Sequence, residues 1–366
     1  MSVAEVLGHY RGKRVLVTGD TGFKGSWLSL WLSELGAKVY GLALPPETTR
    51  DHYVALGLDQ RVNHVDCDIR DFSRLTEVVA EFKPEILFHL AAQPLVRKSY
   101  LEPRTTFETN VQGSVNVLEV VRTSESLRSV VYVTSDKCYQ NREWFWGYRE
   151  NDRLGGHDPY SASKAAAEVV LTSYQSSFFD TRNNLGVASA RAGNVIGGGD
   201  WSQDRIIPDC IAALTNHRPI VLRNPSATRP WQHVLEPLYG YLALGQKLYE
   251  QPKKFSGAWN FGPNISSIRP VYDLAKAMVE AWGGGEVVVS EVGGPHEAQL
   301  LHLNCDKAKH GLGWDPLWNF QRTVALTTDW YKKFNGNAAT LGVSLQQIQL
   351  YTEELTYRDL KETRRD

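Results

Sequence analysis

The sequence predicts an α/β fold, namely a Rossmann-type, doubly wound parallel sheet with a smaller mixed α/β carboxy-terminal substrate domain. Two observations support this prediction. Short apolar runs alternate with amphipathic stretches through the first half of the chain, which is typical of βαβ units around a parallel sheet. From about Gly197 onward the segments become shorter and more polar, with Pro and Gly between them. We therefore expect one domain over residues 1–196 and a second over residues 197–366, from which some segments can return to the first.

The elements of the first half follow from their apolar periodicity. Continuous apolar or β-branched runs predict buried strands, and apolar residues at i, i+3 and i+4 predict helices. The predicted strands are residues 14–19, 37–44, 61–69, 85–92, 129–135 and 186–197, the last of which runs into a loop. The predicted helices are residues 26–35, 72–82, 106–122 and 160–178.

Composition excludes several classes of function. The 366 residues include 40 basic and 41 acidic side chains, and the net charge of −1 gives no field that attracts nucleic acid or an anionic membrane. The amino end lacks the pattern of a secretory signal, and no uncharged apolar run is long enough to span a bilayer. The four cysteines lie far apart, so neither a disulfide framework nor a metal site is indicated. We expect a cytoplasmic protein without metal, nucleic-acid or membrane partners.

A glycine-rich turn is the first motif with chemical meaning. Gly19, Gly22 and Gly25 in "TGDTGFKG" follow a predicted buried strand and open a predicted helix. Glycines let the backbone approach a pyrophosphate, and the helix amino terminus supplies free N–H groups for it. The turn therefore predicts a dinucleotide site, with further contacts from Thr21, Phe23 and Lys24. The alternative, a plain glycine turn, leaves the three glycines unexplained.

The adenosine end of this site is less defined. After the second predicted strand only Glu47 and Arg50 are available near the ribose, so the local sequence does not decide between NAD and NADP. Asp68, with Ile69 beside it, ends the third strand and could accept a hydrogen bond from the adenine amino group. A strand-end turn residue explains Asp68 equally well.

A second constellation is Tyr160-x-x-x-Lys164. Residues four apart on a helix are neighbours. An adjacent ammonium and a cationic nicotinamide ring would both lower the tyrosine pKa and make it a usable base. The order along the chain is the glycine turn, a helix with Asn110, a strand ending at Ser135, and then this pair.

With this set of motifs the chain resembles the extended short-chain dehydrogenase/reductase family, from Lys13 to about Trp330. The resemblance implies that Ser135, Tyr160 and Lys164 form the catalytic triad, that the cofactor is NAD, and that Tyr160 and Lys164 also contact it. It implies a homodimer or a higher homo-oligomer. It also implies contacts on the nicotinamide side of the cofactor from Leu90, Ala91 and Ala92.

The stretch "TSDKCY" indicates a branch of that family. On its own it can be a turn, because Ser and Asp bond nearby backbone and Lys is commonly solvated. Nucleotide-sugar 4,6-dehydratases, however, follow the triad serine with an acid and a base, because they remove a proton from C5 and a hydroxyl from C6. Asp136 and Lys137 fit these roles, and Lys137 stands where most relatives have glutamate. Whether Lys137 is the base or an ammonium that orients substrate stays open.

Residues for a small-molecule nucleotide-sugar substrate are expected mainly in the second part. An arginine fork suits a pyrophosphate, which favours Arg205, Arg223 and Arg229. By resemblance, Asn194 and Arg229 bind the diphosphate. The residues expected near the nucleotide end are Asn264, His296 and Glu297. A solvated surface position is the alternative for each of them.

Other functions remain open at this level. One alternative is a 4-epimerase or a 4,6-dehydratase for another nucleotide sugar, and a non-enzymatic one is an NAD-binding sensor. Asp136 and Lys137 argue against an epimerase, and the intact triad argues against a sensor. The resemblance implies a role in supplying deoxysugars for cell-surface polysaccharide such as the O-antigen of lipopolysaccharide.

Overall fold

The computed structural model describes residues 2–290, 300–334 and 338–363. Its centre is a seven-stranded sheet in the order β11-β6-β5-β4-β1-β2-β3, with every neighbouring pair parallel. The order reverses between β1 and β4, as in a doubly wound fold, which confirms the predicted fold class. The strands are β1 (Arg14–Thr18), β2 (Lys38–Ala43), β3 (Asn63–Asp66), β4 (Ile86–His89), β5 (Ser129–Val133), β6 (Gly186–Ala192) and β11 (Gly257–Phe261).

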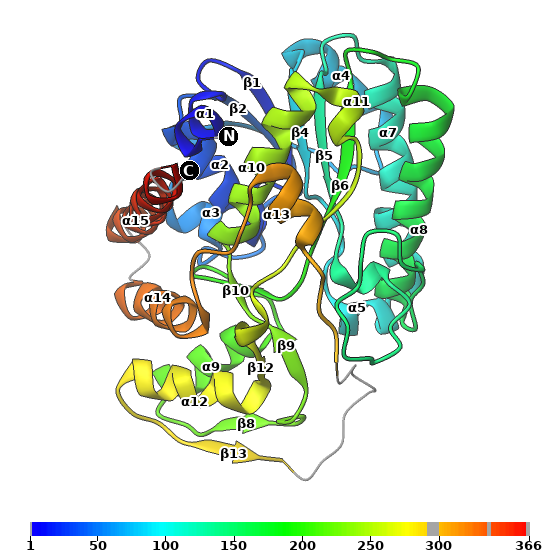
Figure 1. Ribbon diagram of the computed structural model, residues 1–366. Coiled ribbons are helices and arrows are strands. Elements are labelled where there is room, and N and C mark those ends of the chain that lie inside the picture. The colour runs from blue at the N-terminus through cyan, green and yellow to red at the C-terminus, as the bar shows by residue number, and fades with distance from the viewer. Residues whose placement is uncertain (1, 291–299, 335–337, 364–366) are drawn as a thin grey trace.

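Helices cover both faces of this sheet (Figure 1). Alternate strand residues point to opposite faces, so Leu16 belongs to one hydrophobic cluster and its neighbours Val15 and Val17 to another. One layer contains α4 (Phe72–Phe82), α7 (Gly113–Thr123) and α8 (Pro159–Tyr174). The other contains α1 (Val3–Gly8), α2 (Phe23–Glu34), α10 (Leu235–Glu250) and α15 (Ala338–Thr363).

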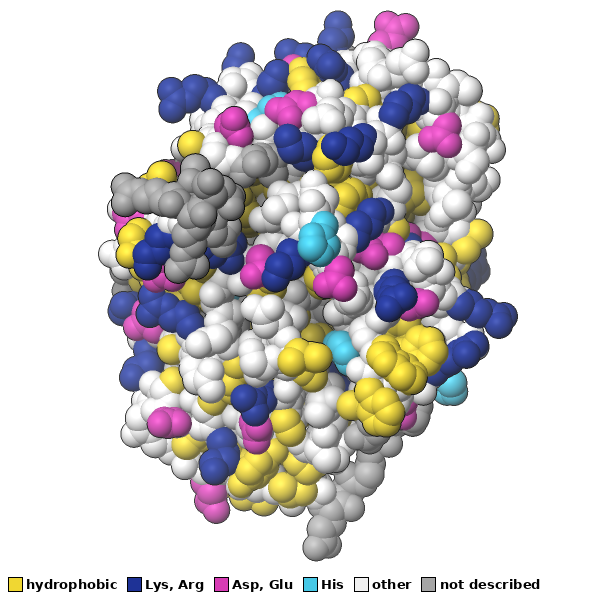
Figure 2. Space-filling view, in the orientation of Figure 1, with side chains coloured by type: hydrophobic (Ala, Val, Ile, Leu, Met, Phe, Trp, Pro, Cys, Tyr) yellow, Lys and Arg dark blue, Asp and Glu magenta, His cyan; other side chains and the backbone are white. Residues whose placement is uncertain are grey.

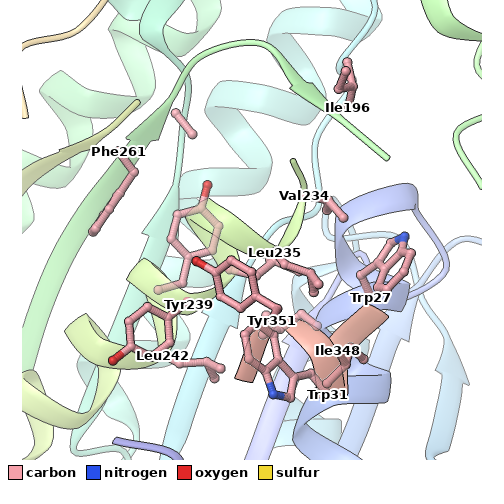
Figure 3. Packing of buried hydrophobic residues seen from close by; sticks show 14 of the residues in the cluster. Trp27, Trp31, Ile196, Val234, Leu235, Tyr239, Leu242, Phe261, Ile348 and Tyr351 are labelled. Atoms are coloured by element: carbon pink, nitrogen blue, oxygen red, sulfur yellow. The ribbon is translucent and has the colours of Figure 1, made fainter. Parts of the chain in front are cut away.

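The second layer holds an aromatic core formed by segments far apart in sequence (Figure 3). Trp31 of α2 and Tyr351 of α15 meet edge to face with ring centroids 5.8 Å apart. Tyr239 of α10 lies 6.3 Å from Tyr351. Aromatic side chains bury large areas, so these contacts attach the carboxy-terminal helix to the first half of the chain.

The chain after Gly197 differs from the expected run of short, polar segments. Helix α10 is buried along most of its length, and β11 extends the main sheet next to β6. Helix α10 is surrounded by protein, so that even its polar residues Glu236 and Gln246 are buried. The expectation of shorter, more polar elements after Gly197 is therefore wrong for the α10 to β11 segment.

A smaller lobe lies beyond the carboxyl ends of the main strands (Figure 1). Within it, β8 pairs with β13 in parallel and β9 pairs with β12 in antiparallel. Its elements are α9 (Ile206–Thr215), β8 (Ile220–Leu222), β9 (Thr228–Pro230), β12 (Ile268–Pro270), α12 (Val271–Trp282) and β13 (Val287–Val289).

The remaining elements connect or flank these two parts. The helical ones are α3 (His52–Ala55), α5 (Val96–Leu101), α6 (Pro103–Phe107), α11 (Pro252–Phe255), α13 (Asp306–Leu312) and α14 (Phe320–Lys333). The strand pair is β7 (Val195–Ile196) with β10 (Gln232–His233). Predicted helix 106–122 becomes α6, a π-turn at Glu108–Gln112 and α7.

The surface carries interspersed positive and negative side chains on the face shown in Figure 2. Among the residues that the structure describes, no helix has the length and apolar character needed to cross a membrane. In those same residues no group of His, Cys, Asp and Glu side chains is arranged to hold a metal ion. Cys67, Cys138, Cys210 and Cys305 are free thiols in the structure.

Candidate active site

The glycine turn follows β1 and leads directly into α2. Gly19 has φ +76, and a Cβ there would lie 2.7 Å from the backbone nitrogen of Ala91. A Cβ on Gly25 would lie 1.9 Å from the carbonyl oxygen of Gly19. Gly22 is the N-cap of α2, and no side chain caps this helix. A turn with glycine at three positions in front of a helix without a side-chain cap fits a pyrophosphate, because backbone N–H groups and the helix dipole both favour an anion.

The presumed acid and base residues follow β5 in a short helical turn. Ser135 is the N-cap of the 3-10 turn Asp136–Cys138 and accepts a hydrogen bond from the Lys137 backbone N–H at 3.2 Å. The Ser135 hydroxyl donates to Asp136 Oδ1 at 3.0 Å. Because β5 is a central parallel strand, this turn lies at the carboxyl edge of the sheet, where ligands of such folds bind.

Helix α8 brings Tyr160 and Lys164 to the same edge. Asp158 caps the helix by accepting from the Ser161 backbone N–H at 2.9 Å, and Pro159 occupies the first helical position. This start places Tyr160 in the first turn and Lys164 in the next. The backbone N–H of Tyr160 also donates to the Ser99 hydroxyl of α5 at 3.1 Å.

Burial controls the charge states of this pair. It raises the pKa of Tyr160 to about 12, while a hydrogen bond with Ser135 opposes the rise. It lowers the pKa of Lys164 to about 8, while the carboxylate of Glu168 opposes the fall. The expected lowering of the tyrosine pKa is therefore not produced by the protein groups alone, because desolvation of the phenolate outweighs them.

Asp136 and Lys137 lie beside this pair. Asp136 is 2% exposed, and its Oδ2 has no hydrogen-bond partner. Lys137 Nζ lies 4.0 Å from Asp136 Oδ1, and the Lys137 side chain is 29% exposed. Lys24 of α2 faces the same region, where burial and then the charges of Lys164 and Arg205 lower its pKa to about 8. Three lysines and one unpaired carboxylate oxygen thus converge on one space.

That space is a cavity of about 1060 Å³ between the strand ends and the smaller lobe. It is large enough for more than one drug-sized ligand. Asn194 points an unpartnered, buried Oδ1 within its wall, and Arg205 is held there by Asp200 at 2.8 Å. The predicted residues that line it are Phe23, Lys24, Leu90, Ala92, Ser135, Asp136, Lys137, Tyr160, Lys164, Asn194, Arg205, Arg223 and Arg229.

Other predicted residues do not line this cavity. Both carboxylate oxygens of Asp68 bond Arg70, with a shortest distance of 2.6 Å, and this contact lowers the Asp68 pKa. Asp68 belongs to a separate hollow with Glu108. Asn264 is exposed, and His296 and Glu297 lie outside the described residues. The other predicted residues away from the cavity lining are Gly19, Thr21, Gly22, Gly25, Ile69 and Ala91.

Two pairs of acidic and basic side chains near the site were not predicted. Asp20, inside the glycine turn, is fully buried and lies 2.8 Å from His64 Nδ1 of β3. Arg97 of α5 donates to Asp204 at 2.6 Å, and both residues line the cavity. Each pair joins residues far apart in the chain, so no short sequence motif predicts it.

The fold and the Ser-Tyr-Lys arrangement on one cavity wall define a dinucleotide-dependent enzyme of the extended short-chain dehydrogenase/reductase type. Residues 16–327 match the family model described as GDP-mannose 4,6 dehydratase. The chain is 48% identical to the CDP-glucose 4,6-dehydratase of Salmonella typhimurium over 352 residues, which is 95% of this chain and 98% of that one.

Solved structures share the fold. An epimerase of Methanothermobacter thermautotrophicus superimposes with a TM-score of 0.77 and 25% identity over 90% of this chain and 95% of that one. The dTDP-glucose 4,6-dehydratase of Bacillus anthracis, in complex with NAD, gives a TM-score of 0.73 and 21% identity over 88% and 97%. The chain belongs to the GDP-mannose 4,6-dehydratase family, which confirms the resemblance seen in its sequence.

Proposed function

We propose that the protein is a hydro-lyase that converts CDP-D-glucose to CDP-4-dehydro-6-deoxy-D-glucose and water, with NAD as its cofactor. The observation that carries this proposal is the placement of Asp136 and Lys137 beside Ser135, Tyr160 and Lys164 on one cavity wall. An acid and a base next to an oxidation triad are what a dehydration between C5 and C6 requires. The 48% identity to a CDP-glucose 4,6-dehydratase favours cytidine as the base of the nucleotide.

The residues present fit the cofactor. The glycines of the turn allow a pyrophosphate to approach the backbone, and Phe23 and Lys24, within the same motif, line the cavity. When bound, NAD would supply the acceptor for the hydride from C4 of the sugar and the donor for its return to C6. Tyr160, as the phenolate, accepts the proton of the C4 hydroxyl, and the Ser135 hydroxyl stabilises that phenolate when it donates to Tyr160 in place of Asp136 Oδ1. Lys164 supplies positive charge behind that phenolate.

Residues Asp136 and Lys137 of the turn after β5 carry out the dehydration. Once C4 is a ketone, the C5 proton becomes acidic, and Lys137 as the neutral amine removes it and becomes an ammonium. Asp136 in its acid form donates a proton to the C6 hydroxyl, which leaves as water, and the Lys137 ammonium finally returns its proton to C5. Asp136 suits the acid role because it is buried and one of its oxygens has no partner within the protein.

The diphosphate of the substrate is bound by the cationic part of the cavity. Arg205, Arg223 and Arg229 line it together with Asn194, whose unpartnered side-chain oxygen can accept from a sugar hydroxyl. Guanidinium groups bind phosphate oxygens through paired hydrogen bonds. The family relationship and this residue set together support a nucleotide sugar as the substrate.

Several broader expectations belong to the same proposal. Residues 1–196 bind NAD and supply the catalytic groups, and residues 197–366 mainly bind the substrate. The protein acts in the cytoplasm as a homodimer or a higher homo-oligomer. Its product supplies deoxysugars for cell-surface polysaccharide such as lipopolysaccharide.

The test uses purified protein with NAD and, in separate reactions, CDP-glucose, dTDP-glucose, UDP-glucose and GDP-mannose. A 4-keto-6-deoxy product is detected by its mass and by alkaline absorbance, with NADP in place of NAD as the matched control. Product from CDP-glucose with NAD is the expected result. Dehydration of another sugar would reassign the substrate, epimerisation would reassign the reaction, and NAD binding without turnover would indicate a sensor.

A further inference from the structure

A buried ion pair lies directly behind the catalytic residues. Glu168 of α8 and Arg191 of β6 have side chains that are 2% and 4% exposed. Arg191 Nε donates to Glu168 Oε1 at 2.9 Å and Nη2 donates to Oε2 at 2.7 Å. This is the bidentate geometry that arginine and a carboxylate adopt when both must stay in fixed orientation.

Stability alone is a weak reason for such a pair. Desolvation of two buried charges offsets most of their attraction, and apolar residues of similar volume often replace them without loss. The other hydrogen bonds of the pair indicate a role, because they hold residues that precede and residues that follow the catalytic turn.

Glu168 holds the beginning of the segment that carries Ser135, Asp136 and Lys137. The Thr134 hydroxyl donates to Glu168 Oε1, and the Ser189 hydroxyl of β6 donates to Oε2 at 2.9 Å. Thr134 immediately precedes Ser135, so the carboxylate fixes the point at which β5 passes into the catalytic turn.

Arg191 holds the end of the same segment. Its Nη1 donates to the Tyr139 hydroxyl at 2.7 Å and to the Glu150 carbonyl oxygen at 2.9 Å. Tyr139 follows the turn directly, and its hydroxyl donates to Asn260 Oδ1 of β11 at 2.8 Å. The ion pair therefore anchors the residues on both sides of the catalytic turn.

Glu168 also lies one helical turn beyond Lys164, on the same face of α8. Besides burial, Glu168 of α8 and Cys138 of the turn act on the pKa of Lys164, and Lys164 in turn lowers the pKa values of Lys24 of α2 and His89 of β4. Of these, Glu168 is the anion that most favours the ammonium form of Lys164 against its burial.

We propose that Glu168 and Arg191 act as positioning residues for the reaction, holding the Ser135 to Lys137 turn in register with Tyr160, and that the Glu168 carboxylate, one helical turn from Lys164, stabilises positive charge on that lysine. The inference rests on the proposed function for the roles of these catalytic residues. Neither Glu168 nor Arg191 lines the cavity, so neither acts on the substrate directly.

Two substitutions separate the two parts of this role. Glu168→Gln removes the anion next to Lys164, so the alkaline limb of the kcat profile should move down by about one pH unit. It should also lower kcat about tenfold through misplacement of the turn. Arg191→Lys keeps the positive charge but loses the fork to Tyr139 and Glu150, so kcat should fall about tenfold while the alkaline limb stays in place.

Glu236→Gln is the matched control, because Glu236 is an equally buried carboxylate on α10 that does not line the cavity. It should change stability and leave the alkaline limb at its wild-type position. Equal movement of the limb in all three variants would show a general effect of buried-charge loss and overturn the proposal. So would an unchanged kcat and limb in Glu168→Gln.

A substrate-independent readout separates this test from that of the proposed function. The dissociation constant of NAD is titrated by calorimetry from pH 6 to pH 10 for wild type and the three variants. The affinity should weaken as Lys164 loses its proton, and at a lower pH in Glu168→Gln than in wild type. Coinciding curves for wild type and Glu168→Gln would refute the role of Glu168, even if no nucleotide sugar is turned over. A curve that is shifted in Glu168→Gln, with no turnover of any nucleotide sugar by wild type, would refute the proposed function alone.

Discussion

Replacing Gly25 with alanine is the most direct test of the glycine turn. A Cβ at this position would lie 1.9 Å from the Gly19 carbonyl oxygen, 2.7 Å from its carbon and 2.9 Å from the Asp20 Cα. The first of these is about 1.5 Å inside an ordinary van der Waals contact. All three atoms are backbone, so no side-chain rotation can relieve the clash and the turn must move away from α2.

The magnitude follows from two opposing effects. Alanine inside a helix is better than glycine by about 1 kcal/mol, whereas overpacking of this kind costs about 1–3 kcal/mol. We therefore expect the free energy of unfolding to fall by up to about 2 kcal/mol. A shift of the turn also breaks hydrogen bonds from backbone N–H groups to the pyrophosphate, at about 1.5–3 kcal/mol each, so NAD should bind at least about tenfold more weakly.

The assay combines urea denaturation with calorimetric titration of NAD. Gly342→Ala is the matched control, because Gly342 also lies inside a helix, α15, and an added Cβ there meets nothing within 4 Å. The control should gain up to about 1 kcal/mol and bind NAD normally. If Gly25→Ala gains stability like the control and keeps wild-type NAD affinity, the steric account of the turn is refuted.

Three further predictions follow from the site and its supports. Burial raises the pKa of Glu236 from 4.5 to about 7, so the stability that this carboxyl contributes is full below pH 4.5 and is lost as pH rises to 7. Urea unfolding should therefore show that the free energy of unfolding falls by about 3 kcal/mol across this range, and Glu236→Gln should reduce this fall. The same pH dependence in wild type and Glu236→Gln would contradict this prediction. Lys137→Met should slow exchange of the substrate C5 proton with deuterated solvent at least about 100-fold with unchanged thermal stability, and full-rate exchange would show that Lys137 only orients substrate. Asp158→Ala removes the cap of α8 and should lower both the free energy of unfolding, by about 1 kcal/mol, and kcat. Asn319→Ala removes the cap of α14 and should lower the free energy of unfolding by the same amount without changing kcat. Similar kcat values in the two variants would contradict a link between the α8 cap and Tyr160.

Local patterns in the sequence determined a large part of the fold. The apolar runs of β1 and β5 and the amphipathic period of α4 depend on neighbouring residues, so their positions were predicted within a few residues. The glycine turn was predictable for the same reason, because its spacing, strand and helix are contiguous. Ser135, Tyr160 and Lys164 were identified by their order along the chain and by family resemblance, and the structure brings them to one cavity.

Long-range pairing decided what the sequence left open. Nothing near residues 257–261 indicates that they pair with β6, since the register of a parallel strand depends on its partner across the sheet. In the sequence nothing distinguishes Glu168 and Arg191 from solvent-exposed polar residues, because only the packing of α8 against β6 buries them as a pair. The charge states of Tyr160 and Lys164 likewise depend on how far tertiary packing removes them from water. The sequence by itself determined which elements form and which chemical groups are present, whereas burial and contacts between distant segments determined how those groups are held and charged.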